Sequence, residues 1–306
     1  MFLKEYFVAG MIMFISEVRR RLRHILLKVL YGPNRGFYIL SENWNYLIIL
    51  DACRYDVFKE VIKKYDLNGR LEYRISRGSN TTEFLMENFG RGYYHDIVYV
   101  TANPFVDLLL KDRFYKIISV WKYGWSDELN TVHPREVFKY ALKAIIAYPN
   151  KRIIVHFMQP HYPFITMRSI KTTGISWLRS QALRGEIVKK QDTHIWMLVA
   201  DGKVPLEVAI NKYRENLEIA MKYVIKLIDY LHGKIVITSD HGEAFGERMH
   251  FLIPKRIYGH VSGVRIKSLV KVPWYVIYKP YRRDKHVVTR MELRKRILMI
   301  KDKLNM

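Results

Sequence analysis

The sequence predicts an α/β fold with a mostly parallel central sheet sandwiched by helices. Short β-branched runs alternate with stretches of helical periodicity along the whole chain, the pattern of sheets built from repeated strand and helix units. Of the 306 residues 49% are apolar, so the chain can bury a substantial core. Its single cysteine, Cys53, excludes an intramolecular disulfide, and the fold must hold without one.

These patterns place the main elements in order. Turn-forming residues at 32–36 separate an N-terminal segment, 1–36, from a domain covering 37–306. A helix is expected to open at the polar turn near residue 81. The other expected helices are 54–64, 134–147 and 205–231, and the expected strands are 46–50, 71–75, 97–101, 152–157, 234–237 and 272–278.

The N-terminal segment combines an apolar run with basic residues. Ten apolar residues at 6–15 precede an arginine cluster at 19–23. A membrane-spanning helix needs about 20 apolar residues, and an export signal carries its charge before the apolar core. We therefore expect a basic amphipathic helix that either docks on the protein or lies on an anionic membrane surface. The last segment, 291–304, also has the pattern of a basic amphipathic helix.

The net charge is +23, which favours anionic partners such as nucleic acid, an acidic membrane face, or phosphorylated and sulfated substrates. Because the basic residues are spread along the chain, a generally cationic, soluble surface is the alternative. No recognisable nucleic-acid-binding module is present, so nucleic acid is not an expected partner.

Potential metal ligands follow two of the expected strands. Asp51 comes after the strand at 46–50, and Asp240 and His241 come after the strand at 234–237. In a parallel sheet these ends share one edge, where ligands bind. Gly242 lets the chain turn sharply, so two carboxylates and an imidazole can converge on one cation. An ordinary polar loop is the alternative for Asp240 and His241.

Further candidates lie in turns. Thr81 and Thr82 end a small polar turn at the head of a helix, where exposed amides favour an attacking alkoxide and an anionic substrate. Helix capping is the alternative for both. His156 and His161 flank a proline-rich turn, and His260 lies in a glycine-flanked loop. His161 or His260 alone would more often be structural than catalytic, but both lie just past strand ends.

These motifs, in this order, resemble the sulfatase-like branch of the alkaline phosphatase superfamily, including its archaeal-looking members. The match runs from about 46 to 278, and the Ser-Asp-His-Gly-Glu run at 239–243, continued by Phe-Gly-Glu, is its most specific part. The resemblance implies an alkaline-phosphatase-like fold. It also implies metal ligands at Asp51, Asp240 and His241, and a metal-bound threonine nucleophile: Thr81, with Thr82 as the alternative.

The resemblance extends to substrate contacts. It implies that His161 and His260 contact the transferred phosphate or sulfate, or ligate a second metal. His156 and Arg54 are further substrate-binding candidates, although Arg54 also suits a surface salt bridge. Oxygen and nitrogen ligands without thiolate fit zinc, manganese or magnesium, and calcium less well, with one or two ions per site.

One departure from the family pattern favours phosphate esters over sulfate esters as substrates. Sulfatases of this branch use a cysteine or serine that becomes formylglycine within a Cys-x-Pro-Ser-Arg context, and Cys53 lacks that context. The expected function is therefore a metal-dependent hydrolase or transferase acting on phosphomono- or phosphodiesters through a threonine. A sulfatase without formylglycine, and a silent member that binds polyanions or membranes, are the alternatives.

An insertion at about 165–204 is expected to shape the substrate pocket. It is basic and contains Trp177 and Trp196, so it forms either a lid over the pocket or a solvated helical excursion. The expected substrates are anionic small molecules, lipid head groups or glycan esters. The expected location is the cytoplasm, with peripheral contact at the inner membrane face.

Overall fold

The computed structural model describes residues 18, 21–22, 25–167, 176–184 and 194–280. The expected helices at 6–15 and 291–304 lie outside the described residues, and so do two stretches of the insertion, 168–175 and 185–193. Among the described residues, no helix has the length and apolar character needed to cross a membrane.

A seven-stranded sheet forms the centre of the molecule, in the order β2-β11-β8-β1-β7-β3-β4. The five strands from β8 to β4 are parallel, and β11 alone runs against both of its neighbours, β8 and β2. The expected mostly parallel sheet is therefore confirmed. Its strands are β1 (Tyr46–Asp51), β2 (Gly69–Ile75), β3 (Tyr94–Thr101), β4 (Phe114–Ser119), β7 (Arg152–Pro160), β8 (Gly233–Thr238) and β11 (Lys271–Lys279).

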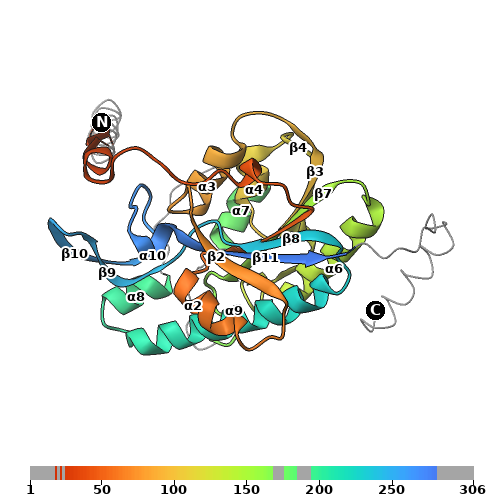
Figure 1. Cartoon of the computed structure of the whole chain (residues 1–306). Helices are drawn as coiled ribbons and strands as arrows, with labels where there is room; N and C mark the ends of the chain where they lie inside the picture. Colours follow the sequence, from red (N-terminus) through yellow and green to blue (C-terminus); the bar gives the residue numbers. More distant parts are fainter. Residues whose placement is uncertain (1–17, 19–20, 23–24, 168–175, 185–193, 281–306) are drawn as a thin grey trace, which may run out of the picture.

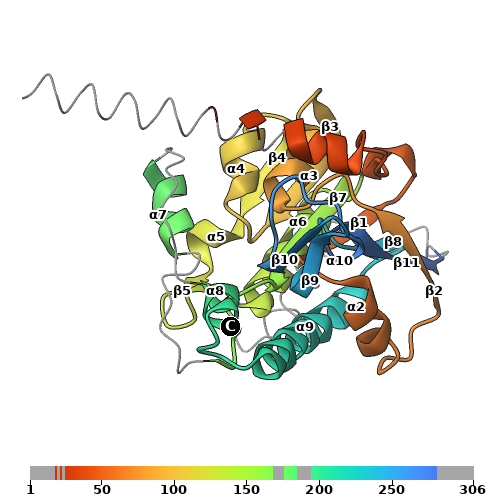
Figure 2. The same cartoon turned by 90° about the vertical axis from the view of Figure 1, so that its left-hand side faces the viewer.

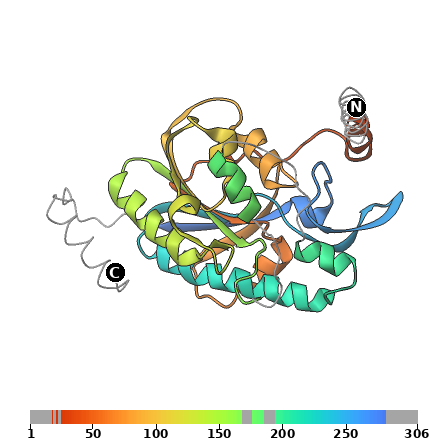
Figure 3. The ribbon, with the colours of Figure 1, turned by 180° about the vertical axis from the view of Figure 1, so that it is seen from behind.

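Helices cover both faces of this sheet (Figures 1 and 3). Along β1, Ile48 and Leu50 pack into the apolar cluster on one face, while Leu47 and Ile49 pack into the cluster on the other. A strand buried on both sides needs such a continuous apolar run. The first face carries α2 (Tyr55–Ile62), α6 (Pro134–Ala147) and α9 (Leu206–Ile228); the second carries η1 (Ile39–Ser41), α3 (Thr81–Phe89) and α4 (Phe105–Leu110).

Shorter elements surround one edge of the sheet. A hairpin of β9 (Ala244–His250) and β10 (Ile253–Gly259) packs against α8 (Ile195–Ala200), and a third apolar cluster joins the hairpin to Leu27. The hairpin and β4 were not expected from the sequence. The remaining elements are α5 (Val120–Tyr123), the pair β5 (Trp125–Ser126) and β6 (Thr131–Val132), α7 (Ser176–Arg184) and α10 (Lys267–Val270).

The five parallel strands and β2 all point toward the edge seen face-on in Figure 2. Asp51 is the last residue of β1, and Asp240 lies just past β8. His161 follows β7, and α3 begins at Thr81 after β2. Parallel pairing therefore gathers side chains from four strand ends at one edge, as ligand sites of open α/β sheets require.

Candidate metal centre and pocket

Hydrogen bonds join the C-terminal ends of β1 and β8. The Ser239 hydroxyl donates to the Leu50 carbonyl at 2.6 Å, and the Ala52 amide donates to Asp240 Oδ1 at 3.0 Å. Ala52 has a φ of 57°, a left-handed conformation that a non-glycine residue adopts only when its surroundings enforce it. Here Tyr213 enforces it, since its hydroxyl donates to the Ala52 carbonyl at 2.6 Å. The strained turn fixes the carboxylates of Asp51 and Asp240 side by side.

The His241 ring has a defined proton position. Nδ1 lies 2.7 Å from the Gly242 carbonyl oxygen. A carbonyl only accepts hydrogen bonds, so Nδ1 carries a proton, and Nε2 is the ring nitrogen left to bind an ion. Gly242 allows this arrangement because a Cβ there would lie 2.0 Å from the Ser268 carbonyl oxygen. The glycine thus brings the chain close to α10 and turns Nε2 of His241 toward the two carboxylates.

Four potential ligand atoms converge at this point. His241 Nε2 lies 3.5 Å from Asp240 Oδ2, 3.8 Å from Asp51 Oδ1 and 3.4 Å from Thr81 Oγ1. Ligand atoms around a tetrahedral zinc ion with bonds of about 2.0 Å stand roughly 3.3 Å apart, close to these separations. Asp51, Asp240 and His241 are also the residues that form a buried group of metal-ligand type within the described chain.

The charges at this point also favour a cation. Asp51 Oδ1 is buried and has no hydrogen-bond partner in the described structure. Burial opposes ionisation of Asp51, but His156, His161 and His241 lower its pKa overall. Two buried carboxylates and an imidazole lone pair aimed at one point repel each other unless a cation lies between them. The donor set therefore fits a divalent metal ion.

The two threonines have different surroundings. The Thr81 hydroxyl is buried and donates to Asp240 Oδ2 at 2.8 Å, while the Thr82 hydroxyl donates to Asn80 Oδ1 at 2.9 Å. Asn80 itself caps α3, since its side-chain oxygen also accepts from the Glu83 amide at 2.9 Å. Neither threonine caps the helix, and of the two only Thr81 contacts the candidate metal ligands Asp240 and His241.

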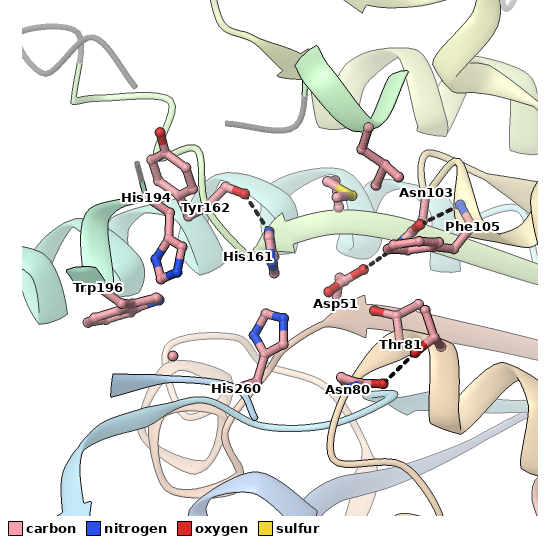
Figure 4. A pocket seen from close by; sticks show the side chains of 14 residues that line it. Asp51, Asn80, Thr81, Asn103, Phe105, His161, Tyr162, His194, Trp196 and His260 are labelled. Atoms are coloured by element: carbon pink, nitrogen blue, oxygen red, sulfur yellow. Dashed lines mark hydrogen bonds between the residues drawn. The ribbon is translucent and has the colours of Figure 1, made fainter. Parts of the chain in front are cut away.

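His161 and His260 face each other in the pocket, on the side opposite Asp51 and Thr81 (Figure 4). Their ring centroids are 5.2 Å apart. His161 Nδ1 bonds the Tyr162 carbonyl, so its Nε2 is unprotonated, and burial lowers the pKa of this histidine. Burial also opposes charge on His260, but the carboxylate of Glu243 raises the pKa of His260 to about 9. One neutral and one cationic imidazole therefore face the site.

Two expected substrate contacts are corrected by the structure. His156 has no exposed surface and lies behind Asp51, with Nε2 3.4 Å from Asp51 Oδ2 and Nδ1 3.0 Å from the Tyr99 hydroxyl. Arg54 forms the salt bridge that was its alternative, with Asp56 and Glu247. Neither residue lines the pocket, because β7 turns His156 into the core and acidic partners hold Arg54 beside the hairpin.

Sequence reasoning missed three residues that hold the site. Asn103 Nδ2 donates to Asp51 Oδ2 at 2.6 Å, and Glu243 Oε1 accepts from His260 Nδ1 at 2.9 Å. Asn216 donates from α9 to the carbonyls of Pro160, His161 and Pro163 and so fixes the loop after β7. Asn103 had a usable signal, because it closely follows the expected strand at 97–101. Asn216 had none, since a polar residue within a helical pattern does not reveal its partners.

The site opens into a pocket of about 360 Å³. Asp51, Thr81, His161 and His260 line one side of it, and the described part of the insertion lines another (Figure 4). That part contributes side chains from α7 and α8, so it does shape the pocket. The apolar and aromatic lining residues are Phe105, Met158, Tyr162, Leu178 and Trp196.

No family model matches the chain, and no curated protein matches its sequence. Among solved structures, the chain is similar to the integral membrane lipooligosaccharide phosphoethanolamine transferase A from Neisseria meningitidis. The identity is 12% and the TM-score 0.49, over 81% of this chain and 48% of the transferase. The chain thus spans about half the length of that protein.

Two further solved structures are similar. One is the C-terminal periplasmic domain of EcEptC from Escherichia coli in complex with zinc, with 15% identity and a TM-score of 0.47 over 82% of this chain and 77% of that domain. The other, from Vibrio parahaemolyticus, has 11% identity and a TM-score of 0.41 over 78% of this chain and 60% of its own. The Vibrio protein is described as a member of the alkaline phosphatase superfamily.

Proposed function

We propose that this chain is a metal-dependent hydrolase or transferase of phosphate mono- or diesters that uses Thr81 as its nucleophile. The observation that carries the proposal is the position of the Thr81 hydroxyl, 2.8 Å from Asp240 Oδ2 and 3.4 Å from Nε2 of His241. Asp51, Asp240 and His241 would hold the ion. When bound, a zinc, manganese or magnesium ion would supply the positive charge that favours a threonine alkoxide.

In the first step the Thr81 oxygen attacks phosphorus. The Thr81 hydroxyl gives its proton to solvent before the attack, an ionisation that a bound ion would favour. A bond forms from phosphorus to Thr81, and the bond to the leaving alcohol breaks. His260 is cationic and gives its Nε2 proton to the leaving oxygen. The product is a phosphothreonine at the head of α3, where the helix dipole favours negative charge.

The second step releases phosphate or transfers it. Water or an acceptor alcohol attacks the phosphothreonine and gives its proton to His260, which the first step left neutral. Thr81 leaves and takes a proton from solvent, and the site returns to its starting state. His161 has an unprotonated Nε2, so it suits accepting a proton or binding a second ion better than donating a proton.

The pocket supports an ester with an apolar or ring-bearing alcohol, because aromatic and aliphatic side chains form the wall opposite the ligands. Lipid head-group and glycan esters fit this description. Cys53 does not favour sulfatase chemistry, since it has no exposed surface and does not line the pocket. The expected cytoplasmic location stays a prediction.

Turnover of three aryl esters by matched variants tests the proposal. A bis-aryl phosphate, a mono-aryl phosphate and an aryl sulfate would be offered with each divalent ion and with a chelator. We expect metal-dependent turnover that favours a phosphate ester. Thr81→Ala should lose on the order of a thousandfold in kcat, whereas Thr82→Ala, one residue away, should change kcat less than about tenfold. Equal activity of both variants, or faster turnover of the sulfate, would overturn the proposal.

A further inference from the structure

The end of the β9–β10 hairpin exposes two large apolar side chains. Phe251 is 80% exposed and Leu252 is 66% exposed. Basic side chains surround this tip, with exposed positions at Arg248, Lys255 and Arg256. An apolar tip within a basic collar is the arrangement that inserts into the head-group layer of an anionic bilayer.

A second apolar patch lies on the helical residues 21–22 and 25–31. Leu27 is buried in the third apolar cluster, and its Cδ1 would lie 2.9 Å from a Cβ placed at Gly263, so this face of the helix is docked on the protein. The other side carries an exposed apolar stripe with helical spacing, and exposed Lys28 lies beside it. The stripe consists of Leu22 (61% exposed), Ile25 (57%), Leu26 (50%) and Val29 (76%).

Tyr31 joins the hairpin and the helix into one surface. Its hydroxyl donates to the Met249 carbonyl, and its ring meets the ring of His250 edge-on at 5.6 Å. Both elements lie on the side of the molecule where the parallel strands end (Figures 1 and 2). The tip, the stripe and the pocket are therefore on the same side.

We propose that the hairpin tip, Phe251 and Leu252, and the helix stripe together form a docking surface for a membrane that contains anionic lipids. Charge favours this partner, because the collar is basic and the chain carries a net charge of +23. Shape favours it as well. The apolar groups stand on a projecting hairpin end and a single helix, which suits insertion between lipids better than the flat, continuous contact of a dimer.

The docking does not depend on the proposed activity, but it would bring the pocket to the membrane surface. Docked in this way, the edge that carries Thr81 and His260 faces the bilayer. Phosphate esters of lipid head groups would then reach the pocket without leaving the membrane surface.

Vesicle flotation tests the surface. The full chain and two docking variants, Phe251→Ser with Leu252→Ser and Ile25→Ser with Val29→Ser, would be mixed with vesicles of phosphatidylcholine alone or with added phosphatidylglycerol. The matched control is Tyr93→Ser with Tyr278→Ser, which removes side chains that are 65% and 70% exposed at the opposite edge of the sheet. Circular dichroism melting and aryl phosphate turnover would show that each variant is folded.

We expect the wild type and the control to float with anionic vesicles and to bind less as salt rises. Either docking variant should partition roughly tenfold more weakly. The inference is overturned if the wild type does not bind anionic vesicles, or if the docking variants bind as the wild type does. Sedimentation showing a wild-type dimer that the docking variants dissociate would also overturn it. Loss of aryl ester turnover in every protein would instead count against the proposed function alone.

Discussion

Glu243 and His260 form an ion pair behind the pocket, with Oε1 2.9 Å from Nδ1. Glu243 has no exposed surface, and its Oε2 has no other hydrogen-bond partner in the described structure. Burial opposes its ionisation, but His260, His161 and His241 lower its pKa. The pair therefore fixes the orientation of the His260 ring and turns its Nε2 toward Thr81.

The first prediction concerns Glu243→Gln. Glutamine keeps an oxygen acceptor for His260 Nδ1 but removes the charge that favours the imidazolium. We expect kcat on a phosphodiester with an alkyl leaving group to fall roughly a hundredfold, and to fall less with a nitrophenyl leaving group, which needs no proton. Steady-state kinetics with both esters measures this. Glu60→Gln, at a surface pair with Arg214, is the control, and equal losses for the two esters would count against His260 as proton donor.

The second prediction concerns metal affinity. Asn103→Ala removes the donor that lies 2.6 Å from Asp51 Oδ2 and orients this carboxylate. Loss of such a partner weakens metal binding by about tenfold to a hundredfold. Competition with a chromogenic chelator measures the change, and Asn68→Ala at an exposed loop serves as the control. Unchanged affinity in the Asn103 variant would contradict the prediction that Asn103 orients Asp51 for metal binding.

The sequence was sufficient for the fold and for the three buried residues that could hold a metal ion, for a local reason. Asp51, Asp240 and His241 each lie within a few residues of the end of an apolar strand, so the pattern of the strand also locates the ligand. The geometry of parallel sheets then brings the strand ends to one edge. No knowledge of the partner was needed at any of these positions.

Partners distant in sequence could not be predicted in the same way. The pair of Glu243 with His260 and the contact of Asn103 with Asp51 depend on the path of the loops and on strand register. His156 was misplaced because β7 continues to Pro160 and pairs with β1, which puts this histidine opposite Ile49 inside the sheet. For Arg54 the sequence indicated a possible salt bridge but did not identify its partners, Asp56 and Glu247 on the hairpin.

The third prediction concerns Gly242→Ala. A Cβ at this position would lie 2.0 Å from the Ser268 carbonyl oxygen, so the backbone beside His241 must move. We expect the free energy of unfolding to fall by about 2 kcal/mol and metal binding to weaken with it. Urea denaturation and metal titration measure the two effects. Gly202→Ala is the control, because no atom lies within 4 Å of its added Cβ, and its backbone cost is about 1 kcal/mol. Equal stability of the two variants would contradict the prediction.

The fourth prediction concerns the pH dependence of stability. Glu42 accepts from Arg74 Nη2 at 2.8 Å and from Lys234 Nζ at 3.2 Å. It so joins a residue near the end of β2 to one near the start of β8. Burial opposes its ionisation, but Arg74 and Lys234 lower the pKa of Glu42 below its ordinary 4.5. A carboxylate whose pKa is lowered by folding stabilises the fold above its unfolded pKa, and this contribution disappears as pH falls through the folded pKa.

Glu42→Gln should therefore reduce the free energy of unfolding by about 0.5 to 1 kcal/mol at neutral pH, a small value because water partly screens the network. The difference from the wild type should stay constant down to about pH 5 and shrink below the unfolded pKa of about 4.3. Urea denaturation at a series of pH values measures it. Glu207→Gln, in the first turn of α9, is the control, since it changes the same charge away from this network. A difference that persists unchanged in acid would show that glutamine disturbs packing and that the charge of Glu42 contributes nothing.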